Sequence, residues 1–195
     1  MFATLLMEEA RTQARRNAGV VGIIGAVAAG AMLMSLLELP VLSSMLLVGA
    51  FVALVAMPAV VSVQAGIEYW TSMYGARGYL TMSLPVKGRS VFAAKTLYAV
   101  IAVLASVAVA TLLLGVPLEQ VLEPVRQMIS MVGTGVLTFY GLTVVEGVVV
   151  MIIEVAAVMS IGAQGRWNRL GFGAPAVGFI VLYAVNQIVA LVATM

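Results

Sequence analysis

The sequence contains no cysteine, no histidine and no aspartate, and few charged residues of any kind. Without cysteine or histidine, it has no thiolate nucleophile, disulfide, imidazole acid–base group or Cys/His zinc site. Charged residues make up 9% of the 195 residues, against roughly a quarter in ordinary soluble domains. The formal net charge of +2 is too small to indicate a nucleic-acid partner. These absences exclude many classes of enzyme and direct attention to the apolar residues.

Hydrophobic residues make up 63% of the chain, and a soluble domain of this size would expose much of that surface. They occur in long runs, and a helix needs roughly 20 apolar residues to cross the core of a bilayer. The runs predict spans near residues 18–39, 41–66, 92–114 and 174–194. The predicted fold class is an all-α membrane protein, with residues 1–195 forming a single transmembrane domain.

The apolar stretch 128–163 has two interpretations: one span near 136–161, or two short spans joined near Glu146-Gly147. Charge placement favours one span, because cytosolic loops of membrane proteins carry an excess of lysine and arginine. With one span, nine of the ten basic residues fall on the same side and only Arg126 falls on the other. The prediction is therefore a bundle of five transmembrane helices with a cytosolic N-terminus and an external C-terminus. Six spans are the alternative.

The N-terminal segment 1–17 is predicted to be an interfacial helix, with a frayed cytosolic tail as the alternative. Its apolar and polar residues fall broadly on opposite faces: Phe2, Leu5, Leu6, Ala10 and Ala14 on one, and Glu8, Arg11 and Arg15 on the other. Glu8 and Glu9 argue against a cleaved signal peptide, because they lie where its positively charged region would be. We therefore expect this segment to be retained.

Small residues recur every four positions in two of the predicted spans, a spacing that allows helices to approach closely in lipid. The two stripes are Gly22, Ala26 and Gly30 in the first span, and Ala102, Ser106 and Ala110 in the third. Lys95 lies one turn inside the third span, and its amine is expected to extend to the membrane interface.

Two glutamates, Glu146 and Glu154, lie inside the predicted span 136–161. A carboxylate there costs roughly 2–3 kcal/mol on insertion scales, and such residues usually face a bundle interior or a water-filled cavity. One interpretation places both in a translocation pathway; the other has them hydrogen-bonded to neighbouring helices. Asn186 and Gln187, in the last span, are expected to form hydrogen bonds between helices.

The cytosolic connection 67–91, between the second and third predicted spans, is the most distinctive stretch of the chain. Tyr79, Leu80 and Leu84 have helical spacing, and Pro85 is expected to end that turn. A short helix carrying exposed apolar residues suits a docking site for a soluble partner. A connector that lies on the lipid headgroups is the alternative.

The run from Gly78 to Lys95 resembles small bacterial ABC-2-type transporter permeases, with Leu84-Pro85, Arg89 and Lys95 matching the family's pattern. The N-terminal segment, in which glutamates precede arginines, is similar to the elbow helix of that family. The resemblance implies a permease subunit of an exporter in the cytoplasmic (inner) membrane, paired with a second permease copy or a paralogue. It also implies a separate cytosolic ATPase subunit that holds ATP and Mg, and the chain itself has no Walker-type phosphate loop.

Within that resemblance, the connection 67–91 corresponds to the segment that docks on the ATPase. The residues implied in ATPase coupling are Tyr74, Arg77, Tyr79, Leu80, Leu84, Pro85 and Arg89. The family usually has six spans with both termini inside, one span more than the charge count favours here.

Two other functions fit the composition: a substrate-capture membrane subunit of a small-molecule importer, and a non-transporting immunity or assembly protein. We expect no cofactor or metal in this chain itself. Met128 and Met131 carry thioethers that could bind Cu(I), but methionine as a packing residue is the favoured interpretation.

Overall fold

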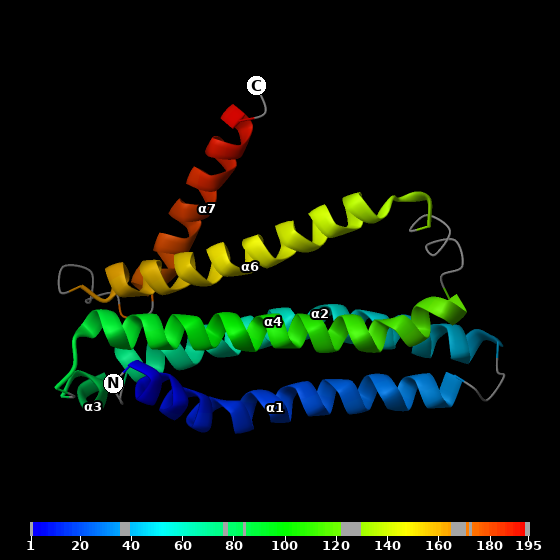
Figure 1. Cartoon of the computed structure of the whole chain (residues 1–195), viewed down its shortest axis with the longest axis horizontal. Coiled ribbons are helices and arrows are strands. Elements are labelled where there is room, and N and C mark those ends of the chain that lie inside the picture. Colours follow the sequence, from blue (N-terminus) through cyan, green and yellow to red (C-terminus); the bar gives the residue numbers. More distant parts are fainter. Residues whose placement is uncertain are drawn as a thin grey trace. The chain divides into compact units, whose positions relative to one another are not determined.

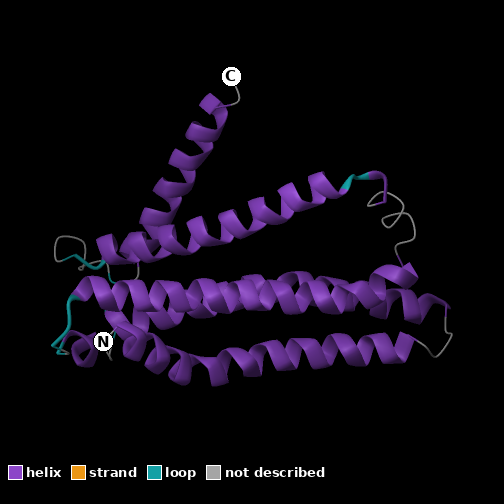
Figure 2. Cartoon of the chain, in the orientation of Figure 1, coloured by secondary structure: helices purple, strands orange, loops and turns teal. Residues whose placement is uncertain are grey.

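The computed structural model describes residues 2–35, 40–75, 78–83, 85–121, 130–164, 171 and 173–193. Regular structure in these ranges is entirely helical (Figure 2). The helices are α1 (Phe2–Ser35), α2 (Pro40–Met73), α3 (Gly78–Met82), α4 (Gly88–Val121), α6 (Thr134–Gly162) and α7 (Gly173–Ala193) (Figure 1). Within this part of the chain, five helices are long and apolar enough to cross a membrane. The predicted all-α membrane fold is confirmed, and the protein is a multi-pass membrane protein.

Helix α6 is a single uninterrupted helix of 29 residues, and Glu146 and Gly147 lie inside it. The chain therefore forms one span here, as the distribution of basic residues predicted, and not two short spans joined at this point. A turn inside the hydrocarbon core would leave backbone N–H and C=O groups without hydrogen bonds, and a continuous helix avoids that cost.

Helix ends differ from the predicted bounds. Helix α1 continues without a break across residue 17, so the interfacial helix and the first span predicted separately form one helix. Helix α2 continues seven residues beyond 66, to Met73. Helix α4 begins at Gly88, four residues before the predicted start. The placement of residues 2–17 at the membrane interface stays a prediction.

One compact unit consists of residues 1–65 and 86–149. In it α1 and α4 run in the same direction and α2 runs in the opposite direction (Figure 1). Their shared core contains Ala28 of α1, Leu54 and Met57 of α2, and Ala110 of α4, all buried. Each of the three helices contributes an alanine to this core, with Ala50 on α2, which allows a close approach, and the larger Leu54 and Met57 side chains fill the space between the helices.

The predicted stripe on α4 belongs to this core, since Ser106 and Ala110 are buried. The predicted stripe on α1 does not, because Gly22 and Ala26 are exposed. A different face of α1, the one carrying Ala28, packs instead. The four-residue spacing was therefore correct for one helix and wrong for the other.

The second compact unit consists of residues 66–85 and 150–195. Within it α6 and α7 cross closely: a Cβ atom at Gly178 would lie 2.6 Å from Cγ1 of Val158. A Cβ atom at Gly162 would lie 2.8 Å from the ring of Pro175. Glycine at these two positions permits the close approach, as small residues do at other helix crossings in membranes.

Candidate functional site

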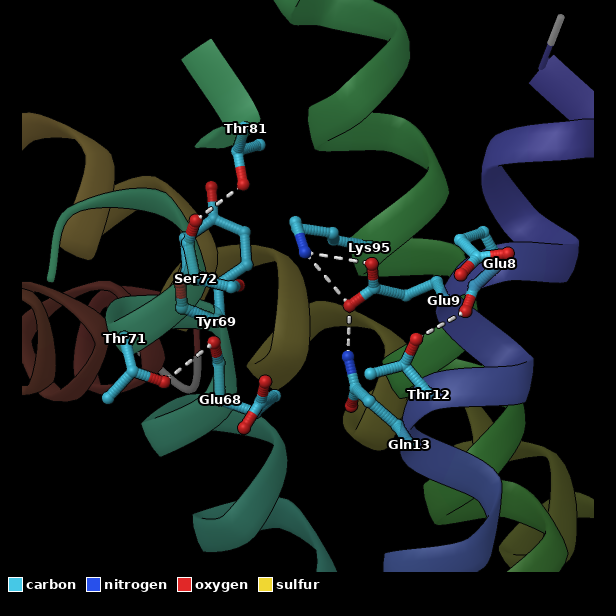
Figure 3. Close-up of polar contacts among 10 residues, drawn as sticks. All are labelled: Glu8, Glu9, Thr12, Gln13, Glu68, Tyr69, Thr71, Ser72, Thr81 and Lys95. Atoms are coloured by element: carbon cyan, nitrogen blue, oxygen red, sulfur yellow. Dashed lines mark hydrogen bonds and ion pairs between the residues drawn. The ribbon is translucent and has the colours of Figure 1, made fainter. Parts of the chain in front are cut away.

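The short helix α3 is held against the end of α2 by hydrogen bonds within the connection. The Thr81 hydroxyl donates to the Ser72 carbonyl oxygen at 2.7 Å (Figure 3), and the Gly78 amide donates to the Gly75 carbonyl oxygen at 2.9 Å. A Cβ atom at Gly78 would lie 2.6 Å from the carbonyl oxygen of Met73, so a larger residue would have to shift the backbone. The turn from α2 into α3 is therefore tight and defined.

Of the residues expected to contact an ATPase, Tyr79 is the most clearly presented, with 70% of its surface exposed. Pro85 and Arg89 are exposed as well. Leu80 lies in α3, but its side chain is not among the described parts of the structure. Arg77 and Leu84 lie outside the described residues. The coupling role of this set stays a prediction.

Tyr74 is arranged differently from Tyr79, because its ring contacts other aromatic rings at the end of α2. Its centroid lies 5.6 Å from that of Trp70 and 6.2 Å from that of Tyr69. The Tyr69 hydroxyl in turn forms a 2.9 Å hydrogen bond with the Ser160 hydroxyl of α6. Tyr74 is half-buried in this cluster and offers a partner less surface than Tyr79 does.

A second polar group joins α1 to α4 in the first compact unit. Nζ of Lys95 lies 2.9 Å and 2.8 Å from the two carboxylate oxygens of Glu9, and Gln13 donates to the same carboxylate (Figure 3). The side chains of Lys95 and Glu9 are only 8% and 16% exposed. The amine of Lys95 is therefore paired with a largely buried carboxylate on α1, a partner that the sequence did not predict, and its place relative to the membrane interface stays a prediction.

The same face of α1 continues one turn further, where Asn17 donates to the Tyr98 hydroxyl of α4 at 3.1 Å. Glu9, Gln13 and Asn17 are four residues apart, so they share one side of the helix. This polar face packs, whereas Phe2 and Ala14 of the predicted apolar face are exposed. Sequence reasoning missed the contact, although the four-residue spacing of long polar side chains was a readable signal.

Glu154 of α6 is paired with Asn186 of α7 inside the second compact unit. Nδ2 of Asn186 lies 3.0 Å and 3.2 Å from the two carboxylate oxygens. The hydrogen bond between helices predicted for Asn186 is confirmed. For Glu154 the geometry matches the second interpretation, in which a neighbouring helix satisfies the carboxyl group.

Glu146 has a different environment, although it lies on the same helix. It is exposed, and within the described residues no hydrogen bond or ion pair reaches its carboxyl group. The two glutamates that the sequence treated alike therefore differ among the described residues: Glu154 has a hydrogen-bond partner on a neighbouring helix and Glu146 has none. A translocation role for either glutamate stays a prediction.

The described part of the chain contains no group of three or more acidic side chains that could hold a metal ion. The polar groups identified are pairs between helices and the exposed surface of one short helix. Comparison of the chain with protein-family models, curated proteins and solved structures found no match in any of the three.

Proposed function

We propose that the protein is the membrane-spanning permease subunit of an ABC-2-type exporter in the cytoplasmic membrane, with its N-terminus in the cytosol. It works as a dimer with a second permease copy or a paralogue, and a separate cytosolic ATPase subunit holds ATP and Mg. The observation that carries this proposal is the exposed Tyr79 on α3, a five-residue helix between two membrane-spanning helices. An aromatic side chain presented on a short, defined helix suits a protein contact.

The link from α3 to the membrane domain supports a coupling role. The hydrogen bond from Thr81 to Ser72 and the close approach at Gly78 attach α3 to the end of α2, which is itself one helix of 34 residues. A displacement of α3 by the ATPase would therefore move the end of a membrane-spanning helix. Closure of the ATPase subunits could in this way shift the equilibrium between inward-open and outward-open states.

The helix that follows the connection is also held in place. Lys95, two turns into α4, is paired with Glu9 of α1. This ion pair links the N-terminal helix to the third span, as expected of an elbow helix that is attached to the transport bundle. The basic residue Arg89 remains exposed one turn and a half earlier, available to an acidic surface on the partner.

Co-purification from the native host tests the proposal. We expect the tagged chain to retain an ABC ATPase subunit. Mass spectrometry identifies that subunit, and ATP hydrolysis is measured in the fractions that contain the complex. Tyr79→Ala should reduce the retained ATPase at least tenfold. Tyr183→Ala is the matched control, because Tyr183 is 66% exposed but lies on α7, in a membrane-spanning segment.

Equal retention in the two variants would show that Tyr79 is not at the contact. A well-folded protein that never retains an ATPase would overturn the proposal. A small molecule that stays bound to the ATPase-free chain through purification would favour a substrate-capture subunit instead.

A further inference from the structure

The end of α2 is attached to α6 by a hydrogen bond between two hydroxyl groups. The oxygen atoms of the Tyr69 and Ser160 hydroxyls lie 2.9 Å apart, and Tyr69 is buried. Ser160 also donates to the carbonyl oxygen of Ala156 at 2.7 Å. A serine hydroxyl has a single proton to donate, so Ser160 is the acceptor in the first bond and Tyr69 is the donor. Tyr69 therefore joins the end of α2 to a defined atom on α6.

The same end of α2 carries α3. The last four carbonyl groups of a helix have no hydrogen-bond partner within it, and here the Thr81 hydroxyl of α3 donates to the Ser72 carbonyl oxygen at 2.7 Å (Figure 3). The Ser72 hydroxyl donates in turn to the Tyr69 carbonyl oxygen at 3.3 Å. Tyr69 and Ser72 are three residues apart, so they lie on the same side of the helix. The attachment of α3 and the attachment of α6 are thus less than one turn of α2 apart.

Van der Waals contacts hold these segments in one compact unit. A Cβ atom at Gly66 would lie 3.8 Å from Cγ1 of Val155, so α2 and α6 also pack together about one turn before Tyr69. The unit consists of residues 66–85 and 150–195, which include α3, the end of α2, the end of α6 and α7. Unlike packing contacts, a hydrogen bond weakens steeply as its angle changes, so the bond from Tyr69 also fixes the rotation of α2 against α6.

We propose that Tyr69 is a positioning residue, whose hydrogen bond to Ser160 makes α3, the end of α2 and the end of α6 move as one body when an ATPase displaces α3. The displacement then reaches α6 and, through the close crossing of α6 and α7, also α7. Without the Tyr69 hydroxyl, the end of α2 turns or slides against α6, and the movement of α3 is not passed on. This role rests on the proposed function and deepens it, because it names the residue that transmits the docking of the ATPase.

Hydrogen exchange of the purified chain in detergent micelles, followed by mass spectrometry, tests the attachment without an ATPase. Tyr69→Phe keeps the aromatic ring and removes only the hydroxyl, and Ser160→Ala removes the acceptor. The amides to follow are those of residues 70–75, which include the last turn of α2 and the turn after it. We expect each variant to speed their exchange about threefold to tenfold, as the loss of one hydrogen bond predicts.

Thr71→Val is the matched control for these variants. Thr71 lies two residues from Tyr69, and its hydroxyl donates within α2, to the carbonyl oxygens of Ile67 and Glu68. The substitution therefore removes a hydroxyl from the same part of α2 and leaves the bond to α6 in place, so exchange should stay within twofold of the natural sequence. Tyr69→Phe combined with Ser160→Ala should exchange no faster than either single variant, because both remove the same bond.

The coupling role is tested with the ATPase bound. Gln164 is exposed and lies two residues beyond the end of α6, so a fluorophore attached to Gln164→Cys, in a chain with no other cysteine, reports on that end of the helix. We expect a non-hydrolysable ATP analogue to change the fluorescence of the complex. The change should persist with Thr71→Val and be at least threefold smaller with Tyr69→Phe, at equal amounts of retained ATPase. A purely structural contact would not alter this response to nucleotide.

Exchange that Tyr69→Phe leaves within twofold of the natural sequence would overturn the attachment, whether or not an ATPase binds. An undiminished nucleotide response in Tyr69→Phe, with the ATPase retained, overturns the coupling role and leaves the proposed function standing. A chain whose exchange responds as expected but which never retains an ATPase overturns the proposed function, and the coupling role with it, while the attachment of α2 to α6 stands.

Discussion

Lys95 of α4 donates to both carboxylate oxygens of Glu9 in α1, across 86 residues of sequence and in a largely buried position. Removing one member of a buried pair leaves an uncompensated charge, which typically costs about 3–5 kcal/mol. We therefore expect Glu9→Leu and Lys95→Met each to lower the free energy of unfolding by roughly that amount. Thermal or denaturant unfolding of the protein in detergent micelles measures it.

The double variant is the control for this pair. Replacing both charges by apolar residues of similar size is often close to neutral, so Glu9→Leu with Lys95→Met should unfold within about 1 kcal/mol of the natural sequence. A double-mutant cycle then gives a large coupling between the two positions. Additive losses in the double variant would mean that the two residues act independently of each other.

Gly178 lies where α7 approaches α6 closely. A methyl group there would lie 2.6 Å from Cγ1 of Val158, which is shorter than any ordinary carbon contact. Gly178→Ala should therefore lower the free energy of unfolding by about 1–3 kcal/mol, the usual cost of overpacking. The measurement is the same unfolding transition in detergent.

Gly22→Ala is the matched substitution on an exposed part of α1, where no atom lies within 4 Å of the added methyl group. It should be neutral or slightly stabilising, because alanine has a higher helix propensity than glycine. Equal losses for Gly178→Ala and Gly22→Ala would contradict the crossing of α6 and α7 seen in the structure.

Asn186 satisfies the carboxyl group of Glu154 between α6 and α7. Asn186→Leu removes both contacts, and hydrogen bonds between membrane helices contribute on average about 0.6 kcal/mol and at most about 1.7 kcal/mol. We expect a loss of stability in that range. Gln187→Leu is the control, because Gln187 is the next residue on α7 and is also exposed. If the two variants unfold alike, the contact between Asn186 and Glu154 adds nothing to stability.

The spans were predictable because each is a long apolar run, and length and hydropathy suffice to detect a membrane-spanning helix. The number of spans near Glu146 followed from the distribution of lysine and arginine. The end of α2 and the start of α4 could not be predicted from the apolar runs, since backbone hydrogen bonding carries a helix beyond its apolar run until a turn interrupts it. At the end of α2 that turn is made at Gly75 and Gly78.

The contacts between α1 and α4 were not predictable in the same way. The sequence did not single out Glu9, Gln13 and Asn17 as a packed face, because their partners, Lys95 and Tyr98, lie more than 80 residues away in sequence. A local pattern shows which residues share a face but not what lies opposite it. For the same reason, the sequence could not show that the face of α1 carrying Ala28 packs, whereas the stripe that begins at Gly22 does not.

The proposed orientation makes a prediction about Ser83 and Met131, which are both exposed and lie in different connections. With the N-terminus in the cytosol, Ser83 lies inside and Met131 lies outside, because three spans separate the N-terminus from Met131 and two separate it from Ser83. In this cysteine-free chain, single Ser83→Cys and Met131→Cys variants can be labelled with a membrane-impermeant maleimide. Met131→Cys should react in intact cells, whereas Ser83→Cys should react only after permeabilisation. The reverse pattern would place α3 outside the cell, where no ATPase could reach Tyr79, and would therefore contradict both the orientation and the function proposed.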